Sequence, residues 1–154
     1  MKSIKEKIEE LHNLYLKVEE RRENWNSKTK DLIFSTLSNI TKEINVDWNV
    51  YHNDTWKNCE TIYLTCGNYP SGVIETTEKG RKMFAKHGGS LSFSQVYNGE
   101  VYIIFKQPYI ETLIEETPSE FIEKISPENI TKEYIEQKFS DFLQVLIDWE
   151  NFKE

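Results

Sequence analysis

The first 44 residues follow a helical pattern of apolar and polar positions. Seven positions recur at alternating steps of four and three: Ile4, Ile8, Leu11, Tyr15, Val18, Arg22 and Trp25. This spacing places one stripe along a helix. A second stripe, out of phase with the first, consists of Ile33, Leu37, Ile40 and Ile44. The phase changes across Asn24-Trp25-Asn26-Ser27, where Asn and Ser favour caps and turns. We therefore expect two helices, 3–24 and 28–44, packed as a hairpin.

A single continuous helix is the alternative interpretation of the same residues. At 1.5 Å per residue it would be about 60 Å long. An amphipathic helix that extends beyond its own domain needs a partner chain to cover its stripe.

From residue 45 the apolar positions alternate with a period of two, which is typical of β-strands. The pattern predicts strands over 46–52 and 60–66, joined through a polar turn at Asn53-Asp54. Residues 77–87 fit either a short helix that ends at Gly88-Gly89 or a second hairpin.

Asn98-Gly99 separates two alternating runs, 90–97 and 100–107, and is a common sequence for a two-residue type I′ turn. Such a turn pairs Gln95 with Tyr102 and Phe93 with Ile104. With this register both faces of the sheet carry large apolar groups, whereas a one-sided sheet has one dry and one wet face. We therefore expect both faces to be covered, by helices or by a second subunit.

The C-terminal third contains further short elements before a long helix. Residues 109–115 fit an edge strand, and Thr117-Pro118-Ser119-Glu120 has the spacing of a capping box that opens a helix through Ile125. The last helix, to about Phe152, carries a wide apolar arc that indicates deep burial across the sheet.

These elements predict one α+β domain over residues 1–154. It comprises a helical hairpin (1–44), a sheet-forming region (45–107) with four to five mainly antiparallel strands, and C-terminal helices (117–153). The length of 154 residues is close to the commonest size of a single domain.

Charge, hydropathy and cysteine content restrict the expected partners and compartment. A net charge of −7 argues against nonspecific binding to nucleic acid, which requires a basic surface. No apolar run approaches the roughly 20 residues of a membrane helix. Cys59 and Cys66 lie too far apart in one predicted strand for a disulfide, which favours buried thiols in the reducing cytoplasm.

The sequence assigns no catalytic residue and predicts no metal or cofactor. The three histidines are scattered and lack the spacing of metal ligands. His52 can face Cys59 or Cys66 across the first hairpin, with Asp54 as an orienting carboxylate. A packed thiol and a surface imidazole are the simpler interpretation.

One basic cluster is a candidate anion site. It consists of Lys79, Arg81, Lys82, Lys86 and His87, followed by two glycines. Side-chain charge and free backbone amides can hold a phosphate or another anion.

Aromatic residues suggest a contact surface in and around the first hairpin. The chain has eight Phe, eight Tyr and four Trp, and exposed Trp and Tyr are typical interface anchors. The candidate partner-binding residues are Trp48, Tyr51, Trp56 and Tyr69.

We expect a non-enzymatic protein-interaction domain: an adaptor, an inhibitor or immunity-type factor, or a small chaperone for one partner. A homodimer through the N-terminal helices or the sheet is compatible with this. The alternative is a small-ligand or anion-binding domain that uses the cluster at 79–89.

Overall fold

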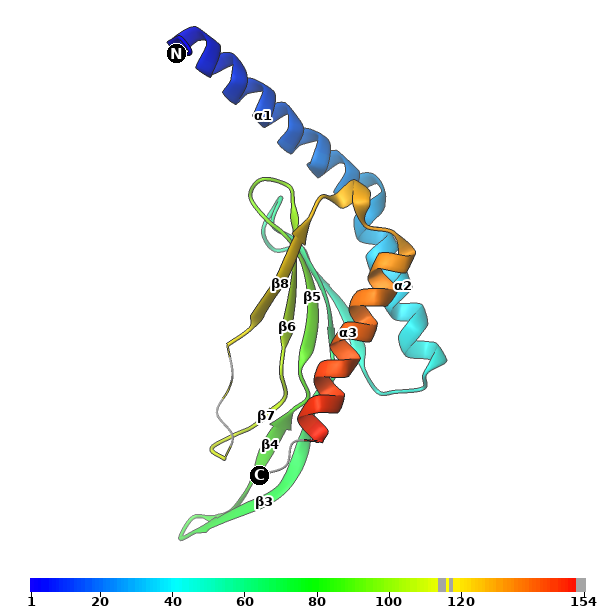
Figure 1. Ribbon diagram of the computed structural model, residues 1–154. Coiled ribbons are helices and arrows are strands. Elements are labelled where there is room, and N and C mark those ends of the chain that lie inside the picture. The colour runs from blue at the N-terminus through cyan, green and yellow to red at the C-terminus, as the bar shows by residue number, and fades with distance from the viewer. Residues whose placement is uncertain (114–115, 117, 152–154) are drawn as a thin grey trace.

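A computed structural model describes residues 1–113, 116 and 118–151 of the chain (Figure 1). Its N-terminal region is one continuous helix, made of α1 (Ile4–Asn24), a π-helical turn (Trp25–Thr29) and α2 (Lys30–Glu43). The predicted helical hairpin is therefore wrong, and the single-helix alternative is correct. A π-helical turn holds one extra residue, so it shifts the phase of the apolar stripe without ending the helix.

The main sheet has five strands, all antiparallel to their neighbours, in the order β1-β2-β5-β6-β8. The strands are β1 (Asn49–Asn53), β2 (Thr61–Thr65), β5 (Ser90–Gln95), β6 (Val101–Lys106) and β8 (Glu120–Ile125). The first hairpin and the mainly antiparallel sheet are confirmed, and so is the α+β class.

A second, three-stranded sheet contains β3 (Asn68–Thr77), β4 (Gly80–His87) and β7 (Tyr109–Ile110). The hairpin alternative for residues 77–87 is thus confirmed, and the short helix is wrong. Figure 1 shows the β3–β4 hairpin reaching away from the main sheet, at the end opposite α1. The predicted edge strand 109–115 is represented by β7, while residues 114 and 115 lie outside the described residues.

The β5–β6 connection differs from the predicted turn by one residue. Gly99 has a φ of +81° and donates its N–H to the Val96 carbonyl, while Asn98 has no positive φ. This is a three-residue loop with a bulge at glycine, not a type I′ turn. Gln95 therefore pairs with Val101 and Phe93 with Ile103. A slip of one residue moves every side chain of a strand to the other face.

The corrected register gives the sheet one covered face. Ile62, Leu64, Leu91, Phe93 and Ile103 lie there fully buried, packed with residues of α2 and α3 (Lys132–Glu150). Both helices lie on this side of the sheet in Figure 1. The other face carries half-buried side chains of β2, β5 and β6, and it has no helix of the described chain over it. The expectation of two covered faces is therefore wrong.

Residues 120–125 form strand β8 and not the predicted helix. Their pairing with β6 places Phe121 opposite Ile104 and adds the fifth strand to the sheet. Thr117, where that helix was expected to begin, lies outside the described residues. The local capping signal is overridden because β6 offers a row of unpaired backbone groups. The long C-terminal helix is confirmed as α3, which begins after the N-cap Thr131 and ends at Glu150.

Cys66 follows β2 and is buried. Burial raises the pKa of its thiol to about 12, although the positive charge of Lys86 lowers that pKa in part. Above pH 9 the unfolded thiol ionises while the folded thiol keeps its proton, so stability falls as pH rises. Between pH 8 and pH 10 we expect the free energy of unfolding to fall by about 1.4 kcal/mol more in the wild-type protein than in Cys66→Ala. Urea unfolding at the two pH values measures this difference. Equal slopes for the two proteins would contradict this.

Candidate docking surface on the N-terminal helix

The N-terminal half of α1 exposes its apolar stripe. Ile4 is 79% exposed and Ile8 62%, and Leu11 and Tyr15 are exposed as well. Leu14 and Leu16 widen the surface. More than a third of the exposed large hydrophobic side chains of the described chain lie in residues 1–16. We call residues 4–16 the α1 arm.

The same stripe becomes buried toward the C-terminal end of α1. Val18 and Arg22 are half-buried, and Trp25 is fully buried in the core. The stripe therefore faces the domain at its base and continues past the edge of the domain along the α1 arm. Figure 1 shows the arm projecting beyond the sheet and α3, with no other ribbon beside it.

Two arginines attach the base of α1 to the β5–β6 loop. Arg21 donates to the Asn98 carbonyl at 3.2 Å, and Arg22 donates to the Tyr97 carbonyl at 2.9 Å. Gly99 allows this close approach, because a Cβ there would lie 2.7 Å from Cβ of Arg21. These contacts fix the direction in which the arm leaves the domain.

An apolar groove of about 540 Å³ lies where α1 meets this loop. Its walls are His12, Tyr15, Leu16, Val18, Glu19, Arg22, Tyr97 and Asn98. The Tyr97 ring is 75% exposed at the edge of the groove. Exposed rings at a concave apolar site are typical anchors of a protein contact.

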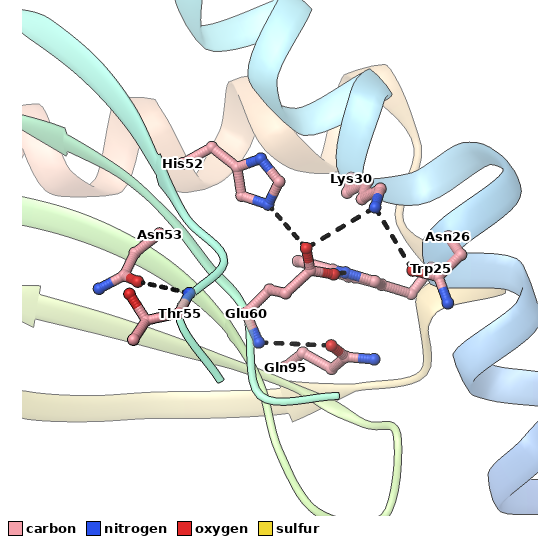
Figure 2. A network of polar contacts seen from close by, with 8 residues as sticks. All are labelled: Trp25, Asn26, Lys30, His52, Asn53, Thr55, Glu60 and Gln95. Atoms are coloured by element: carbon pink, nitrogen blue, oxygen red, sulfur yellow. Dashed lines mark hydrogen bonds and ion pairs between the residues drawn. The ribbon is translucent and has the colours of Figure 1, made fainter. Parts of the chain in front are cut away.

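A buried carboxylate anchors the π-helical turn to the sheet (Figure 2). Glu60, 8% exposed, accepts a hydrogen bond from Nε1 of Trp25 at 2.6 Å. Its other oxygen lies 3.0 Å from Nε2 of His52 and 3.6 Å from Nζ of Lys30. The Glu60 backbone is also paired with Gln95, whose N–H donates to the Glu60 carbonyl at 2.8 Å. The indole, the imidazole and the ammonium group around this carboxylate join the long helix and β1 to the start of β2.

This cluster replaces the predicted arrangement around His52. Within the described residues no hydrogen bond joins His52 to Asp54 or to a cysteine, and the imidazole instead contacts the Glu60 carboxylate. Cys59, before β2, is exposed, and Cys66, directly after β2, is buried. No three His, Cys, Asp or Glu side chains of the described chain are grouped so that they can hold a metal ion. None of the described helices has the length and apolarity of a membrane span.

The four aromatic residues predicted to bind a partner lie in different places. Trp48 packs edge-on against Phe139 of α3, with 6.3 Å between ring centroids, so it contributes to the covered face. Tyr51 is exposed on the outer face of β1, Trp56 is 72% exposed in the loop after β1, and Tyr69 is exposed on β3. The structure does not gather them into one surface.

The basic cluster is divided between the two ends of β4. Lys79, Arg81 and Lys82 are exposed at the tip of the β3–β4 hairpin. Lys86 is paired with Glu150 at 2.8 Å. His87 lies between Asn68 (2.6 Å) and Glu111 (3.1 Å) and is stacked on Tyr109.

Two features of the site were missed in the sequence. In the sequence Glu60 is only the polar first residue of the predicted strand 60–66, and only the fold brings it to Trp25. Tyr97 was assigned to a strand because the turn was placed one residue too late. The stripe itself was visible as a spacing of three and four, and Arg22 within it marks the point where the helix reaches the domain.

Comparison with known proteins gives no relative from which a function can be transferred: no family model, curated protein or solved structure matches the chain.

Proposed function

We propose that the protein is a protein-binding module whose docking element is the α1 arm. The observation that carries this proposal is an apolar stripe on α1 that the described residues leave exposed. Water-exposed apolar surface of this extent is typical of contact sites. An amphipathic helix with anchors at steps of three and four is also a recurrent recognition element.

The rigid base of the arm supports a docking role. The carboxylate of Glu60, the arginine contacts to the β5–β6 loop and the buried Trp25 all hold the last turns of α1. A docking helix that is held in its binding direction loses less entropy when it binds. The acidic balance of the chain suits a partner with a neutral or basic contact surface.

Site-specific photo-crosslinking tests this function. A photo-reactive phenylalanine analogue at Leu11, in the stripe, is expected to capture a protein in extract from the source cells. The same analogue at Asn13, on the opposite face of the same helix turn, is the matched control. No captured protein at Leu11, or equal capture at both positions, would contradict the proposal.

A second candidate function is the binding of a small polar ligand. A hollow of about 210 Å³ between the two sheets favours it, with Tyr63, His87, Ser90, Lys106 and Tyr109 among its lining residues. His87 is the member of the predicted basic cluster that lies there. A thermal-shift screen with phosphates, nucleotides and carboxylic acids tests this function. A ligand present at 100 times its Kd raises the free energy of unfolding by about 2.7 kcal/mol. A response that His87→Ala does not reduce would place the ligand elsewhere.

A further inference from the structure

The hollow between the two sheets lies where the chain crosses twice from one sheet to the other, once between β2 and β3 and once between β4 and β5. The two crossings are hydrogen-bonded to each other. The N–H of Cys66 donates to the Gly89 carbonyl at 3.0 Å, and the N–H of Gly88 donates to the Gly67 carbonyl at 2.9 Å. A Cβ at Gly88 would lie 2.7 Å from Cβ of Cys66, so the crossings pack closely. A recess held by main-chain contacts is preorganised and loses little entropy when it binds a ligand.

The charged side chains at the hollow are already matched within the chain. For His87, Nδ1 lies 2.6 Å from Oδ1 of Asn68, and Nε2 lies 3.1 Å from the Glu111 carboxylate. Lys106 is paired with the carboxylate of Glu116. An incoming anion would have to replace one of these carboxylates, while an incoming cation would meet no acidic residue in the described lining. The arrangement therefore favours a neutral ligand.

Neutral hydrogen-bonding groups form much of the remaining lining. The polar groups of the Tyr63, Ser90 and Gln107 side chains make no hydrogen bond to another described residue. The Thr65 hydroxyl accepts from the N–H of Gly67 at 3.2 Å and keeps its own hydrogen for donation. An apolar ligand would remove water from these groups without replacing its hydrogen bonds, which is costly. The ligand that fits must itself donate and accept hydrogen bonds.

We propose that the hollow binds a neutral ligand with several hydroxyl groups, of the size of a single sugar ring. This inference rests on the second candidate function, the binding of a small polar ligand in the hollow. Its volume of about 210 Å³ is below the roughly 300–1,000 Å³ of pockets for drug-sized molecules, which limits the ligand to one ring. The ring of Tyr63 offers an apolar surface to the C–H groups of a sugar, and Ser90 and Gln107 offer partners to its hydroxyls.

The expected affinity is low. A sugar ring has about a dozen heavy atoms, and neutral ligands of this size gain little binding free energy per atom. We expect a Kd in the millimolar range.

Protein-observed NMR of the full-length chain tests the ligand class. The ¹⁵N-labelled protein is titrated to about 30 mM with neutral hexoses, pentoses and N-acetylhexosamines and, separately, with inorganic phosphate and acetate. At least one neutral sugar is expected to shift the amide signals of Gly67, Gly88 and Gly89 in a saturable way. Saturable shifts with phosphate or acetate alone would overturn the neutral ligand and leave the small-ligand function standing. No saturable shift with any compound would overturn both, and the docking role of the α1 arm is tested independently by photo-crosslinking.

Three variants test the site with the sugar that binds most tightly. Ser90→Ala is expected to raise the Kd by about 2- to 10-fold, because it removes one neutral hydrogen bond. Ser92→Ala is the matched control, since Ser92 lies two positions along the same face of β5 but outside the lining, and its Kd is expected to equal that of wild type. Equal Kd values for Ser90→Ala and Ser92→Ala would place the sugar elsewhere and overturn the inference. Lys106→Gln removes the charge and keeps a donor, so a loss of about tenfold or more would show that charge holds the ligand and would overturn its neutral character.

Discussion

Substitution of Trp25 by alanine is expected to lower the free energy of unfolding by about 3–5 kcal/mol. Trp25 is fully buried at the start of the π-helical turn, and its indole N–H donates to Glu60. The change leaves a cavity in the core and removes the shortest hydrogen bond to a buried carboxylate. Urea unfolding followed by circular dichroism measures the effect.

Two variants separate the causes of this loss. Trp25→Phe keeps most of the ring volume but removes the donor, and it is expected to cost about 1–3 kcal/mol. Trp56→Ala removes an exposed indole and is expected to change stability by less than about 0.5 kcal/mol. A Trp25→Ala protein as stable as Trp56→Ala would show that the π-helical turn does not anchor the helix.

Substitution of Gly99 by alanine is expected to lower the free energy of unfolding by about 2–5 kcal/mol. The backbone at Gly99 has a φ of +81°, which is unfavourable by about 1–2 kcal/mol for a residue with a Cβ. The added Cβ would also lie 2.7 Å from Cβ of Arg21 and push α1 away from the loop. Forced overpacking of this kind typically costs a further 1–3 kcal/mol. Thermal and urea unfolding measure the loss.

Gly72→Ala is the matched control for this prediction. Gly72 has a φ of +85°, but a Cβ there would meet nothing within 4 Å. We expect only the backbone cost of about 1–2 kcal/mol. If the two alanine variants lose the same stability, the approach of α1 to the β5–β6 loop contributes nothing.

Local patterns were sufficient to predict most of the secondary structure but not its exact register. The alternation in 90–95 and 101–106 identified β5 and β6 correctly. A type I′ turn needs positive φ at both Asn98 and Gly99, whereas the observed three-residue loop needs it at Gly99 alone. The sequence Asn-Gly is compatible with both turns. That single residue decided which apolar side chains face the helices.

Long-range contacts explain the remaining differences. Residues 120–125 carry a local helix-start signal, and only the free edge of β6 makes them a strand. The change of phase near Trp25 suggested a break, but Glu60, 35 residues away, receives the indole and the helix continues through a π-helical turn. A sequence window does not contain the partner that decides either outcome.

The candidate site was only partly predictable, because the stripe is a local pattern but its exposure depends on long-range contacts. The stripe of the α1 arm is a local property, so its spacing was visible without a structure. Whether anything in the chain covers the stripe depends on where the helix leaves the domain. That direction is set by Glu60, by two arginines and by Gly99, which are dispersed over 80 residues.

The most direct test of the account is the size of the protein in extract from its source cells. Size-exclusion chromatography of the full chain is expected to give a mass above 18.3 kDa for wild type and for Asn13→Glu. Leu11→Glu, which places the same charge in the stripe, is expected to elute as the 18.3 kDa monomer with unchanged circular dichroism of the folded domain. Identical elution of Leu11→Glu, Asn13→Glu and wild type would show that the exposed stripe of α1 is not a docking surface.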